Sequence, residues 1–434
     1  MKRLLLCAGL MLPLACEALT LEEALASAIS SDPALMGRYA RFNALLEERG
    51  VVTSEYWPQL SLSAGIGPEE TRYSSGQLID EELTRDEASL RIGWLLFNGF
   101  ETHANSKRLS HEAEAERLQL IADAENLALD VCNIYLQVRE AEVLVTLSEH
   151  HVQDHEQIMS DVQRLVSSGF ANDGDVAQVS ARLANARASL VSAKNNYQDV
   201  SAQFMRLVNQ LPSALTDPVA DSLLLPNTLE EALEWAKSSH PQLQSAMSDI
   251  QAAKEEVRAS KSGYYPKIGL EGYANKGHDQ GGFEGPDEDY RVMLTMRYDL
   301  FNGGRDRSRS RASNWRYNEA LAIRTTAERD LMEGTMLSWN ALQSLTEQER
   351  LIRQSVDASS LAEITYMEQY KLGKRTLLDL LNAKVEVFSA RRNYLATKYN
   401  QLQSNYRLLN ATGRLGYALR IAYPQEWAGK EGEE

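Results

Sequence analysis

Proline and cysteine are scarce in this sequence, and each scarcity argues against a class of protein. Eleven prolines in 434 residues leave long stretches in which nothing interrupts a helix. Three cysteines are too few for a disulfide scaffold or a cysteine metal site. No segment after the N-terminus has the roughly 18 consecutive apolar residues of a membrane-spanning helix, so the sequence predicts none.

Basic patches and catalytic motifs are missing as well. The formal net charge is -16 and no block of lysines and arginines is present, which argues against nucleic acid as a partner. The sequence has no glycine-rich phosphate loop, no nucleophile elbow and no pair of catalytic acids. We therefore expect neither an enzyme nor a bound cofactor or metal.

The first 18 residues have the layout of an export signal. A basic start and an apolar core precede Cys16 and Ala18, which stand at the -3 and -1 positions of a cut before Leu19. Lipidation of Cys16 is the alternative, although Pro13 stands where a lipobox has an aliphatic residue. Cleavage at this place leaves Cys132 alone, so no disulfide can form within the chain.

The rest of the chain is one unit written twice. The sequence TLEEAL at 20–25 returns at 228–233, and the Phe-Asn-Gly triplet at 97–99 returns at 301–303. A proline-containing stretch separates the copies. We therefore expect a signal at 1–18, a first repeat at 19–211, a linker at 212–227, a second repeat at 228–415 and a polar tail at 416–434.

Each half opens with a helix and a pair of strands. The helices are expected over about 32–55 and 241–262, each stopped by a proline. Alternating apolar residues then indicate strands with one apolar face, joined by polar loops at 67–87 and 275–289. Strands of about ten residues with aromatic ends suit a bilayer crossing, and an amphipathic hairpin on a soluble domain is the alternative.

Two helices of unusual length follow the strands. No proline interrupts 103–167 or 307–372, so each helix would be on the order of 100 Å long. The helices that return from them carry apolar residues in alternating steps of three and four, which indicates a coiled-coil seam. The seam residues are Val176, Val179, Leu183, Ala186, Leu190, Ala193, Tyr197, Val200, Phe204 and Leu207, then Leu378, Leu381, Val385, Phe388, Arg392, Leu395, Tyr399, Leu402, Tyr406 and Leu409.

A tight turn joins the two helices of each hairpin. Gly169 and Gly373 can take the left-handed conformation that ends a helix. Thr376 can cap the helix after the second turn, with Asp379 three residues on. Turns this short place the flanking helices antiparallel and side by side.

The chain has too few strands to enter a membrane alone, so it would have to assemble with other copies there. Four strands cannot close a barrel, since a single-chain barrel has at least about eight. An open sheet is excluded from lipid, where each unpaired edge group costs several kcal/mol. Two copies would give eight strands and three would give twelve, and the sequence leaves both open.

The repeated halves resemble the TolC family of outer-membrane exit ducts over nearly all of the mature chain. The hairpin motif carries the resemblance most specifically, with Tyr370, Gly373, Arg375, Thr376, Leu377, Leu378 and Asp379. It implies a mainly α fold with membrane β: tandem coiled-coil hairpins and two β-hairpins that trimerise into a twelve-stranded β-barrel and an α-helical barrel. It also implies a place in the cell outer membrane with a long periplasmic extension. The implied partners are outer-membrane lipid, a periplasmic adaptor (membrane fusion) protein and an inner-membrane transporter of ABC or RND type.

The same resemblance assigns a periplasmic gate to the hairpin turns. It implies that Tyr370 and Arg375 link to Asp175 on the first hairpin and that Asp379 forms an acidic constriction. Asn382 stands where members of that family often have an acid, so the resemblance implies one acidic ring instead of two. We expect Asp175–Arg375 contacts to favour the closed state, although each exposed ion pair contributes only about 0–1 kcal/mol.

Simpler interpretations stand beside these roles. Asp379 is also a first-turn acid that suits the helix dipole, and Thr376 is a cap. His150, His151 and His155 lie close together on one helix, and we expect an exposed polar face there and no metal site.

Three functions remain in competition. The segments SWNA at 338–341 and QYKLG at 369–373 resemble the branch serving adhesin secretion, which favours type I secretion of adhesins or repeat toxins. An outer-membrane component of a drug or small-molecule efflux pump is the alternative. A soluble periplasmic coiled-coil scaffold or adaptor belongs to a different class, and it would share the heptads but lack the paired strands.

Overall fold

The computed structural model describes residues 19–73, 79–218 and 224–428. The predicted signal at 1–18 lies outside these residues. The chain divides into two compact units. Within the described residues, unit 1 contains the segments up to 36, 121–241 and 329–426, and unit 2 contains 37–120, 242–328 and the last residues.

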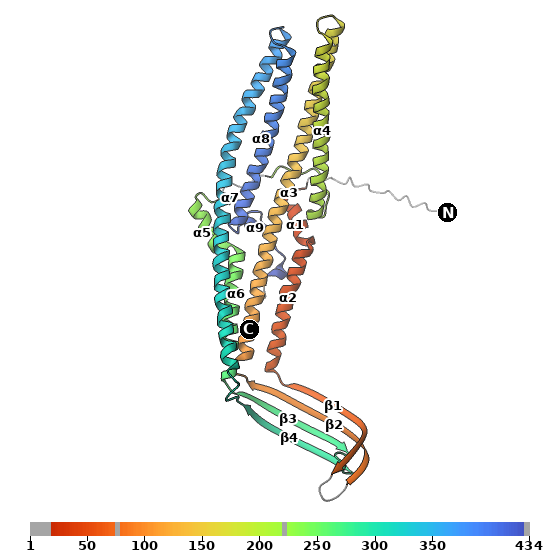
Figure 1. Ribbon diagram of the computed structural model, residues 1–434, viewed down its shortest axis with the longest axis vertical. Helices are drawn as coiled ribbons and strands as arrows, with labels where there is room; N and C mark the ends of the chain where they lie inside the picture. The colour runs from red at the N-terminus through yellow and green to blue at the C-terminus, as the bar shows by residue number, and fades with distance from the viewer. Residues whose placement is uncertain (1–18, 74–78, 219–223, 429–434) are drawn as a thin grey trace, which may run out of the picture. The chain divides into compact units, whose positions relative to one another are not determined.

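Both halves of the chain give the same order of elements (Figure 1). The first half forms α1 (Leu21–Ser31), α2 (Pro33–Thr53), β1 (Gln59–Tyr73), β2 (Ile79–Phe97), α3 (Glu101–Ser167) and α4 (Asp173–Val208). The second half forms α5 (Leu229–Ser239), α6 (Pro241–Ala259), β3 (Lys267–His278), β4 (Pro286–Arg297), α7 (Arg305–Lys371) and α8 (Leu377–Ala411), followed by α9 (Leu415–Ala418).

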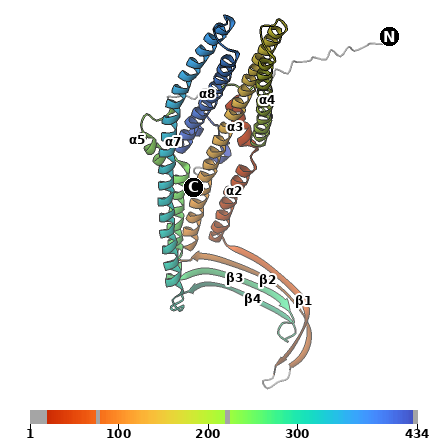
Figure 2. The same cartoon turned by 45° about the horizontal axis from the view of Figure 1, so that its top comes forward.

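The expected mainly α fold is confirmed, and the long helices have nearly the predicted bounds. Both α3 and α7 are 67 residues long. In the two views, α3 lies beside α4 and α7 lies beside α8 (Figure 1 and Figure 2).

A proline divides the start of each half into two helices where the sequence predicted only one. Asp32 and His240 are extended, with φ and ψ of -72° and 119° and of -69° and 120°. Each precedes a proline, whose ring disfavours the helical conformation in the residue before it. The proline itself then begins the next helix, where its missing N–H is no loss. The short helices α1 and α5 are therefore separate elements.

The strands extend well beyond their predicted ends, so the predicted loops at 67–87 and 275–289 were wrong. β1 and β2 pair continuously from Gln59↔Gly93 to Tyr73↔Ile79, and β3 pairs with β4 as far as His278↔Pro286. Charged residues stabilise the polar part of the hairpin across the strands. Arg85 on β2 lies 3.3 Å from Glu69 on β1. A two-stranded ribbon in water needs no apolar face, so hydrophobic alternation did not mark this part.

The two β-hairpins join into one antiparallel sheet of order β1-β2-β3-β4 (Figure 2). The central pair, β2 with β3, links the two halves of the chain. Register places the apolar residues of all four strands on one face: Leu60, Leu62, Leu90, Ile92, Trp94, Ile268, Leu270, Val292, Leu294 and Met296. Most of these side chains are exposed in the single chain.

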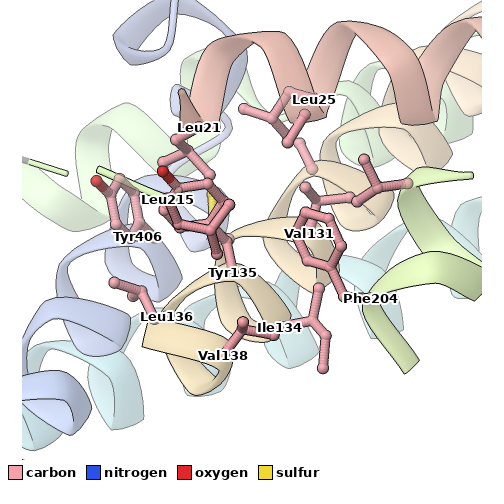
Figure 3. Close-up of a cluster of buried hydrophobic side chains, with 14 of the residues drawn as sticks. Leu21, Leu25, Val131, Ile134, Tyr135, Leu136, Val138, Phe204, Leu215 and Tyr406 are labelled. Carbon is pink, nitrogen blue, oxygen red and sulfur yellow. The ribbon is translucent and has the colours of Figure 1, made fainter. Parts of the chain in front are cut away.

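The main core of unit 1 gathers α1, α3, α4, α8 and α9 around Tyr135 (Figure 3). The Tyr135 ring lies 6.3 Å from the Phe204 ring and is fully buried. Its hydroxyl lies 2.8 Å from the carbonyl of Leu19 and accepts a hydrogen bond from the Thr216 N–H at 3.0 Å. One side chain thus fixes Leu19, the first described residue, and Thr216, between α4 and α5, onto α3.

The seam on α4 is confirmed, and the seam on α8 needs two corrections. Val179, Leu183 and Phe204 are buried. Arg392 was expected in the seam but is exposed. Leu378 was expected in the seam but is 47% exposed, and its neighbour Leu377 is buried instead. Leu377 follows the Thr376 cap and packs with Leu381 against the first hairpin, which sets the phase of the first turn of α8.

The segment after Leu415 is less polar than expected. Leu415 and Leu419 belong to the core of unit 1. In unit 2, Trp427 is buried. Cys132 is also buried and free. Of the helices in the described residues, none is both long and apolar enough to cross a membrane.

Glu125 on α3 is buried against the start of α9. Its carboxylate accepts the N–H of Gly416 at 3.4 Å, and its second oxygen has no hydrogen-bond partner among the described residues. Burial raises the pKa of Glu125 to about 7, although the N–H groups of Gly416 and Leu415 oppose the shift. The folded state therefore favours the protonated acid.

Replacing Glu125 with Gln should stabilise the protein at alkaline pH. A raised carboxyl pKa means that stability falls as pH rises from the unfolded pKa of about 4.5 to the folded value of about 7. At pH 8 we expect Glu125→Gln to gain about 3 kcal/mol, a gain that shrinks to below about 1 kcal/mol near pH 5. Melting temperatures at the two pH values measure this. Glu386→Gln, at an exposed position of α8, is the control, and equal gains at both pH values would contradict the assignment.

Candidate hairpin gate

The first hairpin turn is built on Gly169 and a capping box. Gly169 has a φ of 76°, in the left-handed region, which glycine adopts readily because it has no Cβ. The N–H of Phe170 donates to the carbonyl of Leu165 at 2.8 Å and closes the end of α3. Asn172 caps α4: its side chain accepts the Asp175 N–H at 3.1 Å, and Asp175 accepts the Asn172 N–H at 3.2 Å. Asp175 is thereby held in the first turn of α4.

The second hairpin turn repeats this design with Gly373 and Thr376. Gly373 has a φ of 67°. The Thr376 hydroxyl accepts the Asp379 N–H at 3.2 Å, while the Asp379 carboxylate accepts the Thr376 N–H at 3.2 Å and its hydroxyl at 2.8 Å. The predicted cap is confirmed. Because a capping box fixes the carboxylate, Asp379 serves as first-turn acid whatever else it does.

The two hairpin turns border one groove. It measures about 910 Å³, and Asp175, Tyr370 and Arg375 are among its lining residues. The structure therefore brings three of the four predicted gate residues together. Asp379 is outside the lining and lies 4.0 Å from Arg375.

Arg375 makes its contacts within its own hairpin. The guanidinium lies 4.1 Å from the centre of the Tyr366 ring, and its Nε donates to Gln369 at 3.0 Å. Asp379 completes this set. The described residues of the single chain give no Arg375–Asp175 ion pair, and that contact stays a prediction for an assembly of copies.

The charges of the groove act on Tyr370 and Asp379 in opposite directions. Burial, with the carboxylates of Asp175 and Asp161, raises the pKa of Tyr370. Hydrogen bonds from Thr376 and the nearby charge of Arg375 lower the pKa of Asp379. Tyr370 is thus a neutral hydrogen-bond donor, and Asp379 is a fixed negative charge.

Asn382 contacts the first hairpin from the second turn of α8. Its side-chain oxygen accepts a hydrogen bond from Arg182 on α4 at 3.0 Å. This bond links the two hairpins one turn after Asp379. An amide fills the position and joins the helices without adding a second fixed charge.

Lys384 links the hairpins further along α8. Its ammonium lies 2.9 Å from Asp154 on α3 and 2.6 Å from Glu363 on α7. The side chain is 12% exposed and that of Glu363 is 15% exposed. Burial works against the charge, yet the two carboxylates raise the pKa of Lys384 above its usual value.

The histidine cluster is packed, so the expected exposed face was wrong for two of its three members. His155 is fully buried. His151 stacks on Phe388 of α8 with ring centres 4.1 Å apart, and burial lowers its pKa to about 4. His150 alone is exposed. Among the described residues, no group of three potential ligands is placed to hold a metal ion.

Sequence reasoning missed Lys384 because both of its partners lie on other helices. Asp154 precedes it by 230 positions. The sequence predicts that a lysine beside a heptad seam is exposed to solvent. The packing of α3, α7 and α8 buries this one. The stacking of His151 on Phe388 was hidden in the same way, although Phe388 was placed on the seam.

Comparison with known proteins decides the family. Residues 24–210 and 232–414 match the family described as outer membrane efflux protein. The chain belongs to this family. It is 24% identical to the outer membrane efflux protein BepC of Brucella suis, over 91% of this chain and 86% of BepC.

Further relatives agree with this assignment. The chain is 23% identical to the outer membrane protein TolC of Escherichia coli, over 89% of this chain and 80% of TolC. The fold matches a solved structure of CusC with a TM-score of 0.80, at 14% identity, over 91% of this chain and 92% of that one. The resemblance to the TolC family and the expected outer-membrane location are confirmed, and the family consists of channels and not enzymes.

Replacing Lys384 with Met should loosen the contact between the hairpins. The change leaves the Glu363 carboxylate buried without its cation, which we expect to cost about 2–3 kcal/mol. Adding Glu363→Gln should restore part of this loss, because the uncompensated charge is removed as well. Melting temperatures of the two single variants and the double variant measure the coupling.

Lys194→Met is the matched control for this cycle. Lys194 on α4 also pairs with a carboxylate, Glu149 at 2.9 Å, but both side chains are largely exposed. Its loss should therefore cost only about 0–1 kcal/mol. Equal losses for the two lysines would show that Lys384 is an ordinary surface cation.

Proposed function

We propose that this protein is the outer-membrane exit duct of a tripartite export system, acting as a homotrimer. The observation that carries the proposal is the four-stranded sheet with one continuous apolar face and two free edges. Lipid can cover the apolar face, but it cannot pair the edge groups of β1 and β4. Three copies would contribute twelve strands, and head-to-tail pairing of β4 with the β1 of the next copy would close a barrel.

The hairpins supply the rest of the duct in this proposal. In the assembly, α3, α4, α7 and α8 of three copies would form the α-helical barrel in the periplasm. The repeated seams support this role, because each hairpin buries one stripe and leaves others for neighbours. On α7, Trp315, Ile323, Leu337, Leu351, Leu361 and Ile364 are exposed in the single chain.

The gate is proposed at the groove between the hairpin turns. Tyr370, Arg375 and Asp175 line it, and each is a polar group that can bond across to another helix. Three copies of Asp379 around one axis would favour cations and oppose the close approach of anions. The partners proposed for this end are a periplasmic adaptor and an inner-membrane transporter of ABC or RND type.

For the cargo, we propose type I secretion of adhesins or repeat toxins. The segments at 338–341 and 369–373 support it through their resemblance to that branch. BepC is an outer membrane efflux protein, which keeps a drug or small-molecule efflux component as the second candidate.

Replacing Arg375 with Ser should open the gate. The change removes the guanidinium from Tyr366, Gln369 and Asp379, and from Asp175 in the proposed trimer. We expect a several-fold higher single-channel conductance in planar lipid bilayers. Lys374→Ser, at the exposed neighbouring position, should leave conductance unchanged. A conductance equal to that of the wild type would remove these residues from the gate.

Deleting the gene should separate the two kinds of cargo. If the duct serves type I secretion, the deletion strain should lose its surface adhesin and keep its drug susceptibility. A plasmid copy of the gene should restore the adhesin. A strain that becomes drug-sensitive and keeps its adhesin would overturn the secretion proposal in favour of efflux.

A further inference from the structure

The polar face of the sheet carries a row of arginines that the gate does not explain. Register aligns Ser61 of β1, Arg91 of β2, Tyr273 of β3 and Arg291 of β4 across all four strands. The row contains two cations and no carboxylate. The adjacent rows on the opposite face are apolar, with Leu60, Ile92, Gly272 and Val292 on one side and Leu62, Leu90, Ala274 and Tyr290 on the other.

Tyr273 holds the two guanidinium groups in place. The Arg291 guanidinium lies 4.7 Å from the centre of the Tyr273 ring and that of Arg91 lies 5.5 Å from it. A cation over an aromatic ring keeps its N–H groups free at the edge of the guanidinium plane. Both arginines are exposed, so these N–H groups face solvent.

The acidic residues beside the row affect the two arginines differently. On the same face, Asp289 lies 3.9 Å from Arg291 and partly neutralises it. The other acid beside the row is Glu271 on β3, which lies 3.5 Å from the Thr295 hydroxyl. Arg91 faces Ser61 and Tyr273 across the strands. We therefore expect Arg91 to be the stronger anion ligand of the pair.

The position of the row decides which side of the sheet it faces in a membrane. An arginine on the lipid side near the bilayer centre costs about 2–4 kcal/mol, and the opposite face is already apolar. The arginines therefore face the interior of the proposed barrel. Three-fold symmetry would place three copies of Arg91 at one depth and three copies of Arg291 at one depth.

We propose that Arg91, Tyr273 and Arg291 form an anion-binding band inside the barrel, which takes the carboxylates of passing cargo. This inference rests on the proposed function, since one chain encloses no lumen. The planar guanidinium matches a carboxylate with two parallel hydrogen bonds, and a carboxylate-rich polypeptide presents many such groups. Spacing supports repeated contact: one strand separates the arginines, which places them about 10 Å apart. An acidic chain can pass from one to the next without being held.

The experiment measures the block of single channels in planar lipid bilayers by an oligo-aspartate peptide, added on the side of the strand loops. The wild type should show conductance steps that the peptide blocks reversibly. In Arg91→Gln/Arg291→Gln, block should need at least about tenfold more peptide, because two charge-assisted contacts are lost. The single variants should lie between, with Arg91→Gln the weaker binder. Asp289→Asn should strengthen the block, because it frees Arg291.

The controls separate the possible failures. Arg297 lies at the end of β4, on the same face of the sheet as Arg291. The peptide should block Arg297→Gln at the same concentration as it blocks the wild type. Conductance steps with equal block in wild type and double variant would overturn the band and leave the duct intact. An absence of steps in the wild type would overturn the duct itself. If the double variant does not insert into the bilayer, the two single variants and Asp289→Asn provide the test. Block equal to that of the wild type in all three of these variants would contradict the anion-binding band.

Discussion

The two free edges of the sheet are the constraint on which the rest of the structure depends. Along β1 and along β4, the N–H and C=O groups that point away from the sheet have no strand partner among the described residues. In water these groups would bond to solvent, but hydrocarbon offers none, and several unpaired groups would cost more than the stability of a typical domain. The apolar face is stabilised by contact with lipid, whereas the unpaired edge groups are destabilised by it. Pairing of the edge strands with those of other copies meets both requirements. This constraint supports the proposal that the protein is stable in its membrane as an assembly of copies.

Duplication explains how so long a chain meets that constraint with few kinds of element. α3 and α7 have equal length, and α4 and α8 differ by one residue. Because each repeat ends its long helix at a left-handed glycine and restarts with a capping box, both hairpins turn in the same way. The repeats are linked by the pairing of β2 with β3, by the shared core and by the contacts of Asn382 and Lys384. The repeats diverge where chemistry is needed: Asn172 caps one hairpin and Thr376 the other, and only the second turn is followed by an arginine.

Local signals allowed prediction of the helices and turns, whereas contacts between distant segments stayed hidden. The absence of proline fixed the long helices within about two residues of their ends, and Gly169, Gly373 and the Thr376 cap were legible because each acts on its own neighbours. The strands were too short in the prediction, since alternation stops where both faces meet water. Leu378 was placed one position out of phase, because the cap and the packing of Leu377 decide the first turn. The partners of Lys384 and the stack on His151 required the tertiary structure.

The contacts that stabilise unit 1 differ in strength along its helices, and this difference suits the proposed gate. The core around Tyr135 is fully buried, so opening it exposes large apolar surface at about 25 cal/mol per Å². At the turns, the Arg375 and Asp379 side chains are more than one-third exposed, and such pairs contribute little each. Lys384, buried between carboxylates of α3 and α7, lies between these regions along α8. Local opening follows the weakest contacts. In the proposed gate, the turns would therefore separate while the core stays folded, and Lys384 would limit that motion.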